Sequence, residues 1–89
     1  MRASYQLGMR IVYLRKQRGW TQEELSFQSG INKNYICDME NGRRNPSLEI
    51  IERLAIAFGI SISDLFLGVV VSKWVHYFLL FWLIIVFFY

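Results

Sequence analysis

Residues 21–47 read TQEELSFQSGINKNYICDMENGRRNPS, and this stretch decides the fold. It opens with Thr21 and, three residues later, Glu24, which is the pattern of a capping box. In a capping box the hydroxyl accepts from the third amide of a helix, while the carboxylate reaches back to the cap amide. Gly30 tolerates the left-handed conformation that ends helices. These signals predict a short helix over residues 22–29.

A second short helix is expected directly after this one. Asn32 can cap it and Gly42 can end it, while Ile36 and Met39 are spaced to face inward. The sequence therefore predicts a helix over residues 32–40. Two helices joined by a tight Gly-Ile turn have the proportions of a helix-turn-helix, although other small helical bundles share this spacing.

Helical periodicity continues on both sides of this pair. Upstream, Leu7, Ile11 and Leu14 recur at i, i+4 and i+7, which predicts a first helix that ends at Gly19. Downstream, the Asn-Pro-Ser triplet at residues 45–47 can start a fourth helix, and a last helical turn follows. The expected inward-facing side chains of the fourth helix are Leu48, Ile51, Leu54, Ala55 and Phe58, and the last turn is expected to run through Leu65 and Phe66. No stretch alternates with period two for long enough to predict a strand, so we expect an all-α fold, a compact domain of five short helices.

The composition fits one small domain with few chemical functions. The chain has 89 residues, a net charge of +3 and a pI near 9.3, which permits binding to nucleic acid or to a membrane surface without requiring it. The single cysteine, Cys37, excludes an internal disulfide and a cysteine-based metal site, and we expect it to be a small packed residue. The only histidine, His76, lies in an apolar segment, and no acid–base pair is evident. We therefore expect no enzyme activity, no cofactor and no metal.

Several motifs occur together within residues 7–66. They are the TQEEL opening, the Gly-Ile turn, the Tyr-Ile pair of the third helix, the Glu-Asn-Gly-Arg run after it, Pro46, and the LAIAFGI run. Together they resemble the helix-turn-helix domain of the phage Cro and repressor class (XRE-type), which includes the small controller proteins of restriction–modification systems. The resemblance implies a DNA-binding regulator of transcription whose third helix enters the major groove.

The resemblance also places the DNA contacts at the start of the third helix and on the loop after it. The base contacts that it implies are Lys33, Asn34, Tyr35, Asp38 and Arg44. Lysine can donate to guanine O6 and N7, and asparagine can pair with adenine N6 and N7, so the chemistry agrees with these roles. Each residue could instead be an ordinary solvated side chain. Gln22, at a helix start, and Arg43 are the expected phosphate contacts.

Two acidic residues close to this surface have different expected roles. Asp38 stands where the family often has a neutral donor. Its carboxylate can accept from cytosine N4, or it can shape specificity by exclusion because it repels phosphates. Glu40 is expected to be structural and paired with an arginine of the domain.

A dimer is expected because one such module neutralises few phosphates and binds DNA weakly. The candidate dimer face consists of Ile50, Ile56, Ile60, Ile62 and Phe66. Some of these side chains could equally pack against the C-terminal segment.

Residues 68–89 differ from the domain expected over residues 1–67. Apolar and aromatic side chains dominate them, and Lys73 is their only charged residue. As a helix, residues 69–89 would be about 31 Å long, close to the hydrocarbon thickness of about 30 Å. Lys73 lies near one end and can snorkel. We therefore expect a hydrophobic C-terminal helix that spans the membrane and holds the basic domain at the cytoplasmic face.

Three alternatives to a membrane span stay open for this segment. It could be the helical core of an oligomer, an accidental extension encoded by a T-rich stretch, or an aggregation-prone β-segment. The expected function is a homodimeric, sequence-specific transcriptional regulator. The alternative is an antitoxin-like or membrane-tethered protein-interaction module in which DNA binding is secondary and the tail is an oligomerisation helix.

Overall fold

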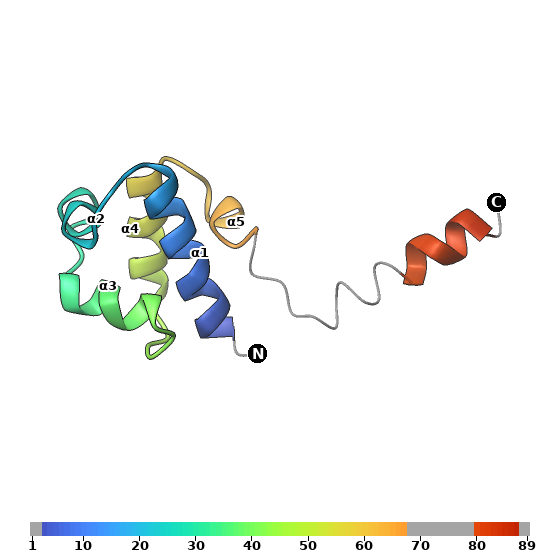
Figure 1. Ribbon diagram of the computed structural model, residues 1–89, viewed down its shortest axis with the longest axis horizontal. Helices are drawn as coiled ribbons and strands as arrows, with labels where there is room; N and C mark the ends of the chain where they lie inside the picture. Colours follow the sequence, from blue (N-terminus) through green and yellow to red (C-terminus); the bar gives the residue numbers. More distant parts are fainter. Residues whose placement is uncertain (1–2, 68–79, 88–89) are drawn as a thin grey trace.

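The computed structural model describes residues 3–67 and 80–87, and these residues are helical or form the turns between helices (Figure 1). The first part contains α1 (Ala3–Gln17), α2 (Gln22–Ser29), α3 (Lys33–Glu40), α4 (Leu48–Phe58) and α5 (Ile62–Leu65). Helix α3 packs against α1 and α2, and α4 packs against α2 and α5. In the view of Figure 1, α2 and α3 lie on one side of α1 and α5 lies on the other. The expected all-α domain of five helices is confirmed.

Side chains cap four of the helices at their N-termini. The Thr21 hydroxyl accepts from the Glu24 amide at 3.1 Å, and the Asn32 side chain accepts from the Asn34 amide at 2.7 Å. Ser47 and Ser61 cap α4 and α5 in the same way. In the expected capping box, the Thr21 half is confirmed. The Glu24 carboxylate instead accepts from the Gln28 side chain at 2.9 Å, because a glutamine one helical turn along competes for it.

The core is formed by apolar side chains from all five helices. Its buried members are Leu7, Ile11, Leu14, Leu25, Ile31, Ile36, Met39, Leu54, Phe58 and Leu65. The inward-facing residues expected in the first and third helices are all buried. The expectation was wrong for Leu48, which is 71% exposed. Periodicity alone places Leu48 on the inner side of α4, but it is the first residue of that helix, one turn before its buried stretch.

A close backbone approach joins α1 to the C-terminal end of α3. Gly8 is buried in the middle of α1, and a Cβ atom added there would collide with the Met39 carbonyl oxygen. The same atom would lie 2.9 Å from the Glu40 carbonyl oxygen. The helices can approach this closely because residue 8 has no side chain.

Three arginines, two in α1 and one directly after it, bind groups on three other helices. Arg10 donates to the carbonyl oxygens of Asp64 and Leu65, at 2.9 and 3.2 Å, at the end of α5. Arg18 donates to the Phe58 carbonyl oxygen at 2.6 Å, at the end of α4, and its guanidinium lies 4.9 Å from the centre of the Phe58 ring. These carbonyls lie at helix C-termini, where the helix dipole favours a cation.

The third arginine, Arg15, holds the end of α3. Its Nε and Nη2 atoms donate to the two carboxylate oxygens of Glu40 at 3.2 and 2.8 Å. Its Nη1 atom donates to the Trp20 carbonyl oxygen at 2.9 Å. The Arg15 and Glu40 side chains are only 12% and 5% exposed. The expectation that Glu40 pairs with an arginine within the domain is confirmed.

The C-terminal segment lies mostly outside the described residues. Residues 80–87 are helical, and their side chains are exposed. Among the described residues, no helix has the length and apolarity needed to cross a bilayer. The expected span over residues 69–89 includes residues that are not described, and both this span and the domain boundary after residue 67 stay predictions.

Replacing Glu40 with glutamine should destabilise the domain strongly, because it leaves the nearly buried Arg15 without a counter-charge. Breaking a buried ion pair from one side costs about 3–5 kcal/mol. Urea denaturation should therefore show a loss of about 3 kcal/mol or more for Glu40→Gln. The matched control is Glu49→Gln, which removes an exposed pair with Arg53 (3.0 Å). That loss should be about 0.5 kcal/mol or less, and equal losses in the two variants would contradict a structural role for Arg15–Glu40.

Candidate nucleic-acid interface

The start of α3 presents polar side chains to solvent while the inner side of the helix is fixed in the core. Ile36 and Met39 are 0% and 1% exposed, so the rotation of α3 about its axis is set by packing. Asn32, Lys33 and Asn34 are all exposed at the N-terminal end. The structure therefore places Lys33 and Asn34 where an incoming duplex can reach them, as their expected base-contact roles require.

Lys33 is paired across the helix-turn-helix with an acid of α2. Its Nζ atom lies 2.6 Å from a carboxylate oxygen of Glu23, and the two side chains are 50% and 65% exposed. The hydrogen bond from Lys33 is the largest cause that lowers the pKa of Glu23, and the same bond raises the pKa of Lys33 above its ordinary value. Both groups are therefore charged at neutral pH, and they neutralise each other at the edge of the candidate surface.

Tyr35, Asp38 and Arg44 form a second group on the same side of the domain. The Arg44 guanidinium lies 4.2 Å from the centre of the Tyr35 ring, within the range of a cation–π contact. It also lies 3.8 Å from a carboxylate oxygen of Asp38. Tyr35 is half-buried and packs partly against the core. The Tyr35 ring therefore contacts the core on one side and the Arg44 guanidinium on the other. The structure brings these three expected base-contact residues together.

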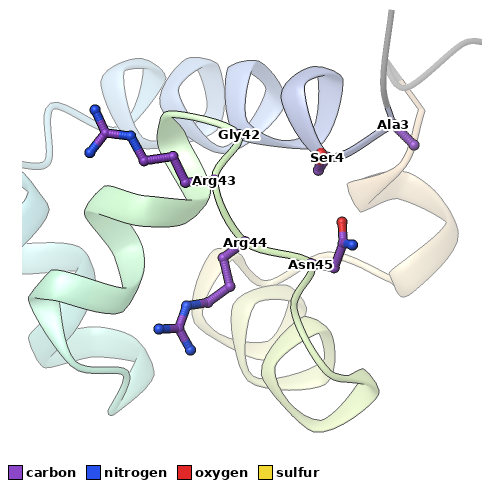
Figure 2. A pocket seen from close by; sticks show the side chains of 6 residues that line it. All are labelled: Ala3, Ser4, Gly42, Arg43, Arg44 and Asn45. Carbon is purple, nitrogen blue, oxygen red and sulfur yellow. The ribbon is translucent and has the colours of Figure 1, made fainter.

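The loop after α3 forms a hollow of about 300 Å³ with the beginning of α1 (Figure 2). Its lining residues are Ala3, Ser4, Gly42, Arg43, Arg44 and Asn45. Figure 2 shows Ser4 and Asn45 facing each other across the hollow, while the side chains of Arg43 and Arg44 extend away from it. Both guanidinium groups are thus carried on the outside of the loop. Within the described part of the chain, no acidic side chain lies within ion-pair distance of Arg43.

Gln22 is the first residue of α2, directly after the cap residue Thr21. Amides at a helix start favour an anion such as a phosphate. Two acids, Glu23 and Glu24, also lie in this first turn. The sequence does not single out Glu23, because it reads as an ordinary acidic first-turn residue, and its pairing with Lys33 depends on how α2 and α3 pack.

The residues expected at a dimer face divide into two kinds. Ile56 and Ile62 are 70% and 40% exposed. Ile50, Ile60 and Phe66 are half-buried and pack partly against the core of their own domain. Leu67, which the sequence pattern does not single out, is 72% exposed. Cys37 is half-buried, as a packed residue of α3 would be.

Helix α3 is short, presents polar side chains to solvent, is fixed by the preceding helix and is followed by a loop with two arginines. This arrangement defines a helix-turn-helix DNA-binding domain. Within the residues that the structure covers, no three His, Cys, Asp or Glu side chains gather as metal ligands would.

Comparison with known proteins identifies the family. The helix-turn-helix family model matches residues 11–65, and the chain belongs to this family. A competence pilus inhibition repressor of Acinetobacter baylyi is 37% identical over 78 residues, which cover 79% of this chain and 71% of the repressor. An immunity repressor protein of Bacillus phage phi105 is 40% identical over 57 residues, which cover 64% of this chain and 40% of that protein. Among solved structures, the restriction–modification controller protein C.AhdI of Aeromonas hydrophila has a TM-score of 0.68 and 40% identity, and the match covers 71% of this chain and 96% of C.AhdI.

These similarities confirm the resemblance to phage repressors and to restriction–modification controller proteins. The relatives are regulators and repressors of transcription, and DNA-binding transcriptional regulation is the function of this chain as well.

Arg44→Ala and Arg43→Ala should separate a base contact from a phosphate contact, since both remove one arginine charge from the same loop. A base contact is worth about 1–3 kcal/mol of discrimination, so Arg44→Ala should weaken binding to the operator about 10-fold to 100-fold and binding to unrelated DNA much less. Arg43→Ala should weaken binding to both duplexes alike and reduce the salt slope by about 0.9. Fluorescence anisotropy titrations at several salt concentrations measure both effects. Parallel losses for the two variants would contradict the base-contact role of Arg44.

Proposed function

We propose that the chain acts as a homodimer that reads a specific DNA operator through the N-terminal end of α3. The observation that carries this proposal is the placement of Lys33 and Asn34. Both are exposed at the first turn of a helix whose inner side is buried and whose far end is held by the Arg15–Glu40 pair. A reading helix must be held in this way because base recognition depends on the position of hydrogen-bond donors to within a fraction of an ångström.

Each side chain of this surface has a role that its chemistry supports. Lys33 donates to guanine O6 and N7, and Asn34 pairs with adenine N6 and N7. Arg44 reaches a base edge from its position over the Tyr35 ring. Asp38, half-exposed beside Arg44, accepts from cytosine N4 or excludes other bases. The Tyr35 ring contributes through its apolar surface, by contact with a thymine methyl group.

Gln22 and Arg43 contribute phosphate contacts that fix the domain on the duplex. Gln22 lies at the start of α2, where helix amides also face an anion. Arg43 extends from the loop after α3, as Figure 2 shows. Such contacts carry little sequence information but set the register in which α3 meets the bases. No catalytic step forms part of this function.

The dimer face that we propose centres on Ile56 and Ile62. Contact between water and an isoleucine side chain is unfavourable, so covering these side chains in a dimer interface stabilises the dimer. Ile50, Ile60 and Phe66 lie beneath this face, since they are half-buried against the core. A two-fold dimer presents two reading helices to half-sites about one turn of DNA apart.

The C-terminal segment, in this proposal, tethers the dimer to the inner face of the membrane, so that the DNA-binding domain is cytoplasmic. The support is the sequence of residues 69–89, which is apolar and aromatic apart from Ser72, Lys73 and His76 and is long enough to span as one helix.

Selection from a random duplex library by the full chain tests the dimeric operator. The selected sequence should have two-fold symmetry, with half-sites about 10 base pairs apart from centre to centre. Ile56→Asp should sediment as a monomer and bind this operator at least 10-fold more weakly, because burying an unpaired carboxylate opposes association. Leu48→Asp is the matched control, since Leu48 is equally exposed on the same helix (71% against 70%). A dimeric Ile56→Asp variant would contradict this dimer face, and a selected site with a single asymmetric half would contradict the dimer itself.

Alkaline-carbonate extraction of cells tests the tether. The full chain should stay with the membrane pellet, and a chain ending at residue 67 should be extracted into the supernatant, because only a spanning helix resists this treatment. Complete extraction of the full chain would exclude the anchor. If that soluble chain sedimented as a larger oligomer than the truncated one, the tail would be an oligomerisation helix.

A further inference from the structure

The Glu23 carboxylate lies between the start of α2 and the start of α3, next to the surface proposed to meet DNA. It lies in the first turn of α2, one residue after Gln22, and 2.6 Å from the ammonium group of Lys33 at the first residue of α3. Its own backbone amide and the Thr21 hydroxyl also lower the pKa of this carboxyl group, after the larger effect of Lys33. A helix-start amide, a hydroxyl and an ammonium are the groups with which proteins bind DNA phosphates.

The ionisation of the pair agrees with this geometry. The pKa of Glu23 is lowered first by the hydrogen bond from Lys33 and next by its own backbone amide. The pKa of Lys33 is raised, first by the same hydrogen bond and next by the charge of Glu23. An ammonium held in this way is not available to another anion unless the carboxylate is displaced.

We propose that Glu23 restrains Lys33: it pairs with the ammonium group in the free protein and weakens the contacts of Lys33 with phosphates, until the two acceptors of an operator base replace the carboxylate. This inference rests on the proposed function, since it assigns a partner to Lys33 in the free protein and another in the operator complex. On unrelated DNA the carboxylate competes with phosphates for Lys33, so that Lys33 adds less to phosphate binding than a free lysine would. On the operator, guanine O6 and N7 together replace the carboxylate.

The pair is weak enough for this exchange. Both side chains are at least half-exposed. An exposed ion pair of this kind favours the paired over the unpaired arrangement by no more than about fivefold. Removing Glu23 should therefore raise operator affinity by no more than about fivefold. On unrelated DNA, the released Lys33 gains a phosphate contact, and the increase in affinity has the same limit because it cannot exceed the worth of the lost pair.

The test compares Glu23→Gln with Glu24→Gln in the full chain. Both variants remove one negative charge from the first turn of α2, but the Glu24 carboxylate accepts from Gln28 and not from Lys33. Anisotropy titrations with a selected operator and an unrelated duplex of equal length, at 50 to 200 mM salt, give affinities and salt slopes. Circular dichroism checks that each variant is folded.

For Glu23→Gln we expect binding to the unrelated duplex that is tighter by up to about fivefold at 50 mM salt, together with a steeper salt slope. The slope on the operator should be unchanged, because Lys33 contacts a base there in both proteins. Glu24→Gln should show neither change. In a Lys33→Gln background, the effect of Glu23→Gln on the unrelated duplex should disappear.

The inference is overturned if Glu23→Gln binds unrelated DNA no more tightly than Glu24→Gln does, or if its effect persists without Lys33. Weaker operator binding by Glu23→Gln would also overturn it, since Glu23 would then position Lys33. Failure of the proposed function looks different, because the unaltered chain would then show no preference for any duplex.

Discussion

The bidentate ion pair between Arg15 and Glu40 is the contact on which the rest of the structure depends. It joins α1 to the last residue of α3, with both side chains nearly removed from water. The backbone contact at Gly8 also joins these two helices and allows them to approach without an intervening side chain. A buried ion pair is worth little as stabilisation against an apolar replacement, but it is directional. Here that direction fixes the end of the helix whose other end presents Lys33 and Asn34.

Six of the ten basic residues of the chain fall into two groups with different functions. Arg10, Arg15 and Arg18 are used inside the domain, where each binds a carbonyl or a carboxylate on another helix. Lys33, Arg43 and Arg44 are outside, at the start of α3 and on the loop after it. The net charge of +3 is a sum over the whole chain and does not show where the positive charge lies. The arginines of the first group hold α1 in place, so the positive charge available to DNA is concentrated at α3 and the loop after it.

The candidate DNA surface balances its own charge. Glu23 forms an ion pair with Lys33, and Asp38 lies close to Arg44. The Arg44 guanidinium also packs on the Tyr35 ring. Such pairing reduces attraction to phosphates, the part of DNA binding that is independent of sequence. It leaves the directional contacts to base edges to distinguish one site from another. A small regulator gains from this balance because non-specific sites compete for it in large excess.

The sequence by itself determined the helices and their ends, because caps and glycine stops are local interactions. Thr21, Asn32, Ser47 and Ser61 bond amides two or three residues away, and such contacts can be read from spacing. The exposure of Lys33 and Asn34 followed from the same local pattern. Only the tertiary structure decided which arginine binds which helix, that Gly8 is a contact point, that Leu48 is exposed, and that Glu23 meets Lys33. Each of these depends on the packing of elements that are distant in the chain, for which periodicity within one helix carries no information.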